Sequence, residues 1–400
     1  MAALGVFVFV FALLASIALH ELGHLGTAKA FGMKASRYFI GMGPTLWSTR
    51  RGETEYGVKA FPVGGFVKIV GMTQLEDLED PRDEPRAFWR QPAPQRAVVL
   101  AAGSAMHFVV AFVVLVGTLL AYGEQTRDTT RVAEVSECLS ELPTDPCDGK
   151  PPAPAKVAGL REGDRIVAFQ GTPVRSWDAF TTLVRAADAG PADLVVERDG
   201  ERVTLHPVVE RHEREIAEGQ RKVIGQIGVT PGETKRYNVL TVGPRAGSAL
   251  AEFTVNSVSG LWHLPGKIPQ LFEQTTASKG EQPRDPGDGG VVGIVDIGRL
   301  SAQAFEAGQV DAVLFMIVGL NVFIGLFNLL PLLPLDGGHL AILGFEEARS
   351  GIARSLGRPD PGRVDLQRLM PAMVAFIVLM GGLTVMLLYA GIANPIANPF

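Results

Sequence analysis

Two histidines and a glutamate stand in the first apolar stretch at a spacing that suits a metal. The run H-E-L-G-H at residues 20–24 fits the pattern H-E-x-x-H. On a helix this pattern puts His20 and His24 on one face, with Glu21 beside them as a general base. Residues 2–19 carry no charge. Ionisable side chains are costly in a membrane, so in an apolar span they mark a functional site, here predicted to bind zinc.

A third ligand must come from elsewhere in the chain, because catalytic zinc sites use three protein ligands and keep one open position. Besides Glu21, the candidate carboxylate is Asp336, which lies at the end of the third long apolar segment in the run L-D-G-G-H at residues 335–339. The preceding N-L-L-P-L-L-P, residues 328–334, must break a helix. Broken backbone at membrane depth is tolerated where protein buries it or water reaches it, which suits a wet internal site.

Four apolar segments must position these residues, near 3–31, 97–122, 312–335 and 369–393, and each could span a bilayer. No Lys or Arg occurs in the first 28 residues or after Arg368. Short basic loops stay in the cytoplasm, so both termini and the long segment after the second span are expected outside. A net charge of −5 argues against a nucleic-acid partner.

The outer segment contains the chain's two cysteines, Cys138 and Cys147. Their spacing is compatible with a disulfide in an oxidising compartment; the alternative is two free thiols. The run A-G-L-R-E-G-D-R-I at residues 158–166 precedes a helical pattern at 177–187 and a hairpin across Asp199-Gly200. This order resembles a PDZ domain of the bacterial protease type; the alternative is another small β-rich domain.

Two further segments have recognisable patterns. Residues 61–67 read as two strands joined at Gly64-Gly65. Residues 250–262 have helical spacing of apolar residues, which predicts an amphipathic helix on the outer membrane surface or a helix packed on the PDZ-like domain.

The paired motifs and the PDZ-like segment between the second and third spans make the chain resemble the bacterial site-2 proteases, of the regulator of sigma-E protease type. The resemblance implies His20, His24 and Asp336 as zinc ligands and Glu21 as the base that activates a zinc-bound water. It also implies that Asn328 binds substrate or stabilises the transition state. A re-entrant cytoplasmic β-hairpin aligns substrate in this family, and here its matching residues are Gly64, Gly65, Phe66 and Val67.

The expected fold is an α-helical polytopic membrane protein with four transmembrane helices, a cytoplasmic membrane-associated β-hairpin and an extracytoplasmic α+β PDZ-like domain. The expected segments are a first span 1–31, a cytoplasmic loop 32–96, a second span 97–122, the PDZ-like domain 123–210, an outer linker 211–311, a third membrane segment 312–345, a cytoplasmic loop 346–368, and a fourth span with the outer C-terminus 369–400.

The expected function is zinc-dependent cleavage, in a bacterial plasma membrane, of a peptide bond within or near the transmembrane segment of a single-span protein. The resemblance implies regulated intramembrane proteolysis of an anti-sigma factor already trimmed by a site-1 protease. A metal transporter would show repeated halves, and a PDZ scaffold with an inert site would not need Glu21.

The run G-S-A-M-H at residues 103–107 departs from the family's G-P-x-x-N, so His107 is either near the site or a buried structural residue. His339 is expected behind the ligands or at a helix end.

Overall fold

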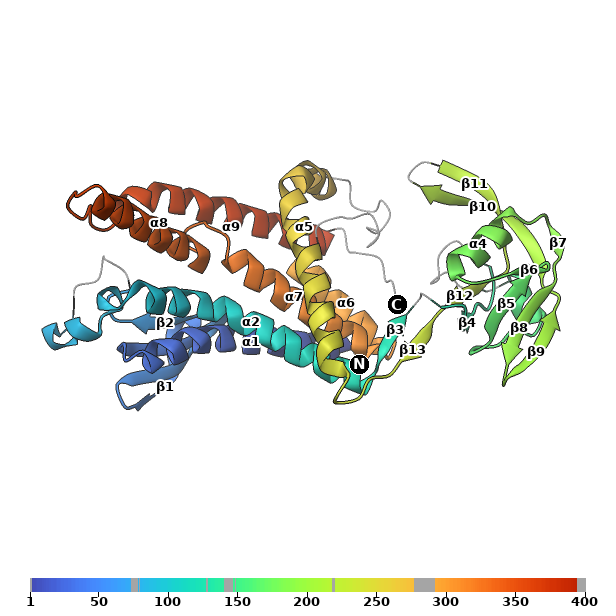
Figure 1. The fold of residues 1–400 in the computed structure, drawn as a ribbon, viewed down its shortest axis with the longest axis horizontal. Coiled ribbons are helices and arrows are strands. Elements are labelled where there is room, and N and C mark those ends of the chain that lie inside the picture. Colours follow the sequence, from blue (N-terminus) through green and yellow to red (C-terminus); the bar gives the residue numbers. More distant parts are fainter. Residues whose placement is uncertain are drawn as a thin grey trace. The chain divides into compact units, whose positions relative to one another are not determined.

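The computed structural model describes residues 2–72, 78, 80–126, 129–139, 147, 149–217, 220–276 and 292–393. These residues form two compact units (Figure 1). Leu119–Thr241 is one, called here the inserted unit, and the described residues before and after it form the other, called the helical unit.

Within the described residues, the helical unit contains four helices long and apolar enough to cross a membrane: α1 (Ala2–Ala30), α2 (Ala93–Ala121), α7 (Val310–Asn328) and the stretch Leu366–Ala393 that contains α9 (Met370–Ala393). The four predicted apolar segments therefore form long apolar helices, which is compatible with the expected polytopic membrane protein. The third helix ends at Asn328 rather than at residue 335, because the two prolines that follow it cannot continue a helix. A new helix, α8 (Asp336–Ser355), begins directly after them.

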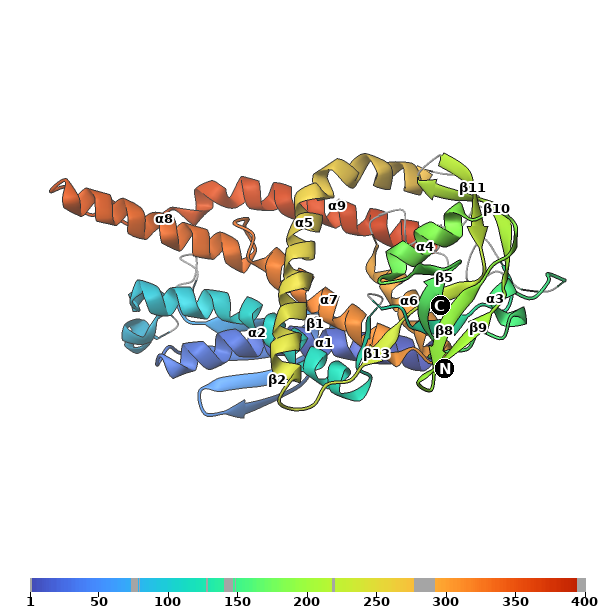
Figure 2. The same cartoon turned by 45° about the vertical axis from the view of Figure 1, so that its right-hand side comes forward.

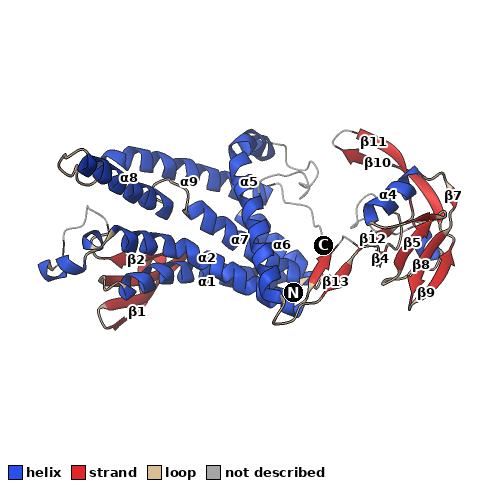
Figure 3. Cartoon of the chain, in the orientation of Figure 1, coloured by secondary structure: helices blue, strands red, loops and turns tan. Residues whose placement is uncertain are grey.

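Between α1 and α2 the chain forms an antiparallel sheet of β1 (Ala35–Arg51) and β2 (Thr54–Ile69), drawn as red arrows in Figure 3. β1 and β2 are joined by a turn at Gly52, which has a φ of +62°. Tyr38 of β1 pairs with both Tyr56 and Val67 of β2, so the chain also reverses within β2 between these two residues, in agreement with the predicted turn at Gly64-Gly65. At Gly64, with a φ of +76°, the pairing register shifts, and glycine adopts that backbone without strain.

The hairpin is held against the helices by a shared apolar core. Leu25 of α1, Ile69 of β2, Leu100 of α2 and Leu343 of α8 belong to one buried cluster. Two short 3₁₀ helices, η1 (Pro81–Arg86) and η2 (Phe88–Arg90), follow the hairpin, and Phe88 joins the same cluster. This core brings β2, α1 and the start of α8 to one place.

Two more helices complete the described part of this unit. The helix predicted at 250–262 is present as part of α5 (Val242–Thr276), and α6 (Ile294–Glu306) follows it. Phe253 of α5 stacks on Phe315 of α7, with ring centroids 6.4 Å apart. Neither of the two predicted environments for this helix included that contact, and Figures 1 and 2 show α5 crossing α7.

The inserted unit has a four-stranded sheet in the order β6-β5-β8-β9, covered by α4 (Trp177–Ala186). Its strands are β5 (Arg165–Phe169), β6 (Thr172–Pro173), β8 (Leu194–Arg198) and β9 (Glu201–Leu205). The predicted hairpin across Asp199-Gly200 is confirmed, and both residues have positive φ angles of 52° and 85°. These angles match the type I′ turn that joins two strands tightly.

The inserted unit extends past residue 210, where the sequence had suggested a linker. Its remaining elements are β3 (Glu124–Thr126), β4 (Val132–Val135), α3 (Pro154–Val157), β7 (Gly190–Pro191), β10 (Val208–Ala217), β11 (Gln220–Gln226), β12 (Val229–Pro231) and β13 (Glu233–Lys235). The strands β12 and β13 pair with β4 and β3, so the end of the unit returns to its beginning. Cys138 and Cys147 form a disulfide, as the sequence favoured.

An ion pair between a buried aspartate and an arginine stabilises this unit. The Asp164 side chain is 1% exposed, and its two oxygens accept hydrogen bonds of 2.8 and 2.7 Å from Nε and Nη2 of Arg198. The backbone N–H of Arg161 donates to the same carboxylate. Burial alone would raise the pKa of Asp164, but these hydrogen bonds and the Arg198 charge outweigh it, so the pKa of Asp164 lies below its ordinary value.

Candidate metal centre

The two histidines of α1 face one another across a single helical turn. Nε2 of His20 lies 3.2 Å from Nε2 of His24, and both residues are buried. Nδ1 of His24 lies 2.7 Å from the carbonyl oxygen of Val99 in α2. Because a carbonyl can only accept, Nδ1 carries the proton, which leaves the lone pair of Nε2 available to a metal.

Asp336 completes the group from the opposite end of the sequence. Its Oδ2 lies 3.3 Å from Nε2 of His20 and 3.4 Å from Nε2 of His24. The three ligand atoms lie within 4.8 Å of one another, and they form the metal-compatible group found among the described residues. The sequence-predicted set of His20, His24 and Asp336 is therefore brought together.

The donor set fits a zinc ion. Oδ2 of Asp336 is buried and has no hydrogen-bond partner among the residues that the structure describes. Two imidazole nitrogens and one carboxylate oxygen converge on the same point, and three such ligands with an open fourth position are typical of catalytic zinc. A cation between them would satisfy all three at once.

Three glycines allow this convergence. A Cβ at Gly103 of α2 would lie 2.3 Å from Nε2 of His24 and 2.7 Å from Nε2 of His20. Cβ atoms at Gly337 and Gly338 would lie 2.2 Å from backbone atoms of Leu329 and 2.6 Å from those of Leu332. The first turn of α8 can therefore pack on the preceding loop and direct Asp336 at α1.

Glu21 points to the hairpin rather than to bulk lipid. Its carboxylate accepts a hydrogen bond from the backbone N–H of Val67 in β2. A Cβ at Gly65 would lie 3.0 Å from Cγ of Glu21, so β2 approaches the glutamate closely. Phe66 stacks on Phe39 of β1, with ring centroids 5.6 Å apart, and Gly64 lies at the register shift. Of the four predicted hairpin residues, Gly65 and Val67 thus adjoin Glu21.

Asn328 is the last residue of α7 and is half-buried. Its side chain has no hydrogen-bond partner within the described part of the chain. His339 lies one turn past Asp336 on α8 and lines a separate pocket.

Another amide of α7, Asn321, was not singled out from the sequence. Its Oδ1 accepts a 2.9 Å hydrogen bond from Nδ1 of His107, whose ring centroid lies 5.1 Å from that of His20. Both His107 and Asn321 are buried, at 2% and 1% exposure. A polar side chain in the middle of an apolar span was the signal that could have identified Asn321.

Comparison with known proteins gives the same family along nearly the whole chain. The model of "Peptidase family M50" matches residues 8–357. The chain is 36% identical to zinc metalloprotease Rip1 of Mycobacterium tuberculosis and 34% identical to Rip1 of Mycolicibacterium smegmatis, and each alignment covers 98% of both chains. It is 29% identical to metalloprotease MmpA of Caulobacter vibrioides over 84% of this chain and 85% of that protein. The chain therefore belongs to peptidase family M50.

Proposed function

We propose that this protein is a zinc-dependent endopeptidase that cuts a peptide bond within or near the transmembrane segment of a single-span membrane protein. One observation carries the proposal. Two histidines from a helix that could cross a membrane meet the carboxylate of Asp336, and Glu21 lies beside them. His20, His24 and Asp336 would hold the zinc ion.

Zinc in such a position supplies Lewis-acid chemistry, since it polarises a peptide carbonyl and makes a water molecule more acidic. Glu21 takes the proton of the attacking water and passes it to the leaving amine. The N–H of Val67 holds the carboxylate of Glu21 in place for this transfer. The hydrogen bond from His24 to Val99 fixes the tautomer that the ligand role requires.

The hairpin gives the substrate a place to bind in an extended form. A peptide bond inside a helix is shielded by its own hydrogen bonds, so the substrate must unwind before water can attack it. β1 and β2 form a sheet of two strands, and the stretch Gly64–Val67 of β2 lies next to Glu21. An unwound segment can pair with this edge through backbone hydrogen bonds. Asn328, at the end of α7, is proposed to contact the substrate from the other side of the broken helix.

The remaining assignments follow the charge distribution. The loops 32–96 and 346–368 are proposed to be cytoplasmic, and the termini and the inserted unit extracytoplasmic, in a bacterial plasma membrane. The disulfide of the inserted unit supports its extracytoplasmic location, because disulfides persist in oxidising compartments. We assign the inserted unit as the PDZ-like domain. The substrate class is an anti-sigma factor first trimmed by a site-1 protease.

The proposal is tested with purified full-length protein and a candidate single-span substrate. Glu21→Gln keeps all three metal-binding side chains, so zinc content should match the wild type while cleavage falls by at least about 100-fold. Asp336→Ala removes a ligand, so zinc content should fall as well. Metal is measured by elemental analysis and cleavage by gel. Full cleavage by Glu21→Gln would reject the mechanism.

A further inference from the structure

The two histidines of α1 are held in different ways. Nδ1 of His24 donates to the carbonyl oxygen of Val99, 2.7 Å away, and a hydrogen bond of this kind normally orients a metal-binding histidine. Nδ1 of His20 is buried and has no hydrogen-bond partner among the residues that the structure describes. The orientation of the His20 ring must therefore depend on another contact.

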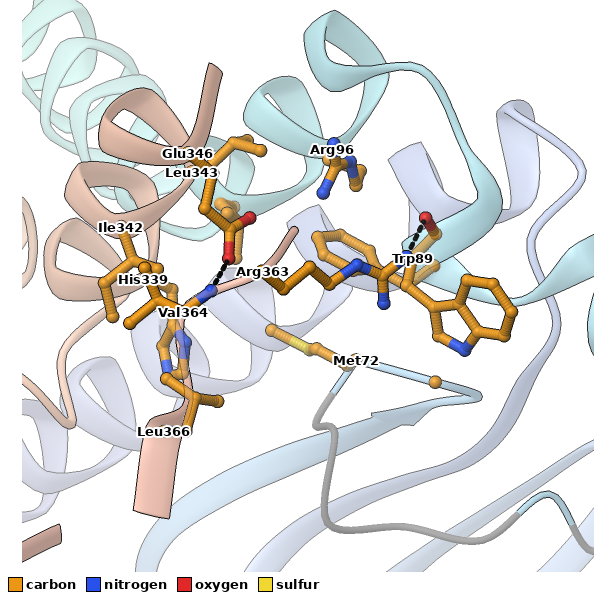
Figure 4. A pocket seen from close by; sticks show the side chains of 13 residues that line it. Met72, Trp89, Arg96, His339, Ile342, Leu343, Glu346, Arg363, Val364 and Leu366 are labelled. Atoms are coloured by element: carbon orange, nitrogen blue, oxygen red, sulfur yellow. Dashed lines mark hydrogen bonds between the residues drawn. The ribbon is translucent and has the colours of Figure 1, made fainter. Parts of the chain in front are cut away.

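Two residues of α2, one helical turn apart, lie against the ring of His20. A Cβ at Gly103 would lie 2.6 Å from its Cε1, so the backbone of α2 comes close to the ring at this point. The ring of His107 lies beside it, with centroids 5.1 Å apart and planes tilted by 44°. The histidine nearest Asp336 in sequence, His339, instead lines a separate pocket (Figure 4). The position of the His107 ring thus limits how the His20 ring can turn.

His107 is held in turn by a side chain of α7. Nδ2 of Asn321 donates a 2.9 Å hydrogen bond to the backbone oxygen of Ile317, which fixes the amide nitrogen on that side. The amide oxygen then faces Nδ1 of His107, which lies 2.9 Å from it. Because this oxygen can only accept, Nδ1 of His107 carries the proton. Both side chains are buried, so water cannot readily replace the hydrogen bond between them.

The helices α2 and α7 pack closely at this pair. A Cβ at Gly325 of α7 would lie 3.1 Å from Cβ of His107 and 3.3 Å from the backbone oxygen of Ser104. Residues four apart on a helix share a face, so Asn321 and Gly325 meet α2 at two successive turns. A shift of α7 would therefore move His107.

We propose that His107, held by Asn321, is a positioning residue that fixes the orientation of His20 for metal binding. This role rests on the proposed zinc peptidase function, since His20 is one of its metal ligands. Asn321 of α7 holds His107 of α2, and the His107 ring restricts His20 of α1. α7 also leads into the loop before Asp336. One helix thus sets the position of ligands from both ends of the sequence.

The test is a cobalt(II) titration of metal-free, full-length protein in a non-ionic detergent, followed by visible absorption. Cobalt(II) binds to the same nitrogen and oxygen ligands as zinc, and its absorption bands change with ligand geometry. His107→Leu and Asn321→Leu should each weaken cobalt binding about tenfold and shift the bands, as is typical when a contact behind a metal ligand is lost. Thr118→Val is the control, because it removes a hydrogen bond of a buried hydroxyl on the same helix and should leave the titration unchanged.

The double variant His107→Leu, Asn321→Leu separates positioning from folding. It replaces both polar partners by apolar side chains, so thermal stability should stay close to the wild type. Cobalt binding should still be about tenfold weaker, with no loss beyond that of His107→Leu, because both residues act through one contact. Recovery of wild-type binding and bands by the double variant would overturn the positioning role. A wild type that binds no cobalt would instead reject the metal centre, and with it the proposed function.

Discussion

Because Gly103 has no Cβ, α2 can come close to His20 and His24. An added Cβ would lie 2.3 Å from one ligand nitrogen and 2.7 Å from the other. No contact of that length is tolerated, so either α2 or the imidazoles must move. Nε2 of His20, Nε2 of His24 and the side chain of Glu21 would shift together, since all three residues are on α1.

Gly103→Ala should therefore reduce proteolysis by about 100-fold, the cost of roughly 1 Å of misplacement in an active site. Zinc content should fall as well. Gly117→Ala is the matched control, because it lies on the same helix and its Cβ would meet no atom within 4 Å. Zinc content and cleavage rates of the two purified variants check this. Equal activity in both would show that the approach of α2 is not needed.

Sequence reasoning found the residues that carry chemistry but not those that make room for them. His20, Glu21 and His24 follow from a local pattern, and Asp336 from its position beside a proline-broken helix. Gly103 and the pair His107–Asn321 act through contacts between helices, which no local spacing encodes. A glycine in an apolar run has many possible reasons, and tertiary packing selects among them.

At the scale of elements, β2 does two things at once near Glu21. The N–H of Val67 hydrogen-bonds to the carboxylate of Glu21, and the same strand is the proposed edge for substrate pairing. Val67→Pro removes that N–H and blocks pairing at this point. Cleavage should slow by at least about fivefold, corresponding to one lost hydrogen bond, while zinc content stays unchanged.

Val67→Ala is the control for this prediction, since it shortens the side chain but keeps the N–H. It should cleave close to the wild-type rate if the backbone carries the interaction. Steady-state kinetics with one substrate and elemental analysis of both variants provide the comparison. Equal slowing by alanine and proline would shift the role from the backbone to the Val67 side chain.

Element boundaries were predicted best where one residue type forces them. Asp199-Gly200 forms a tight turn, and Pro331 and Pro334 end α7, because their backbone preferences are local. The turn at Gly64-Gly65 was predicted for the same reason, because glycine accepts the positive φ that Gly64 adopts. The strands β12 and β13 were missed because their partners lie about 100 residues earlier, and such pairing leaves no local signal.

At the scale of the whole molecule, the two compact units should respond separately to damage. Asp164→Ala removes a buried carboxylate that accepts three hydrogen bonds and leaves the half-buried Arg198 without its ion-pair partner, so the inserted unit should lose about 2 kcal/mol of stability. Hydrogen exchange of the full-length protein should show lost protection in β5 and α4. Zinc content should not change. Asp188→Ala is the control, because its carboxylate is fully exposed and its ion pair contributes little, so protection should stay at the wild-type level.

The same pair predicts an acid limit for the inserted unit. Because folding lowers the pKa of Asp164, its contribution is complete above the unfolded value near 4 and is lost as the pH falls through the lower folded value. Protection of β5 should therefore fall below about pH 4 in the wild type, and less steeply in Asp164→Ala. If the protection of β5 falls equally steeply with pH in the two proteins, groups other than Asp164 cause the acid sensitivity.

The distance in sequence between His24 and Asp336 bears on how the enzyme is made. During synthesis the chain reaches the membrane from its N-terminus, and the two histidines are in place long before the third ligand exists. Two imidazoles alone form an incomplete centre, and Asp336 takes its position only after α7 has inserted and the loop before α8 has packed. A ribosome-bound chain therefore has no assembled protease, and a product truncated before α8 should be inert toward its neighbours.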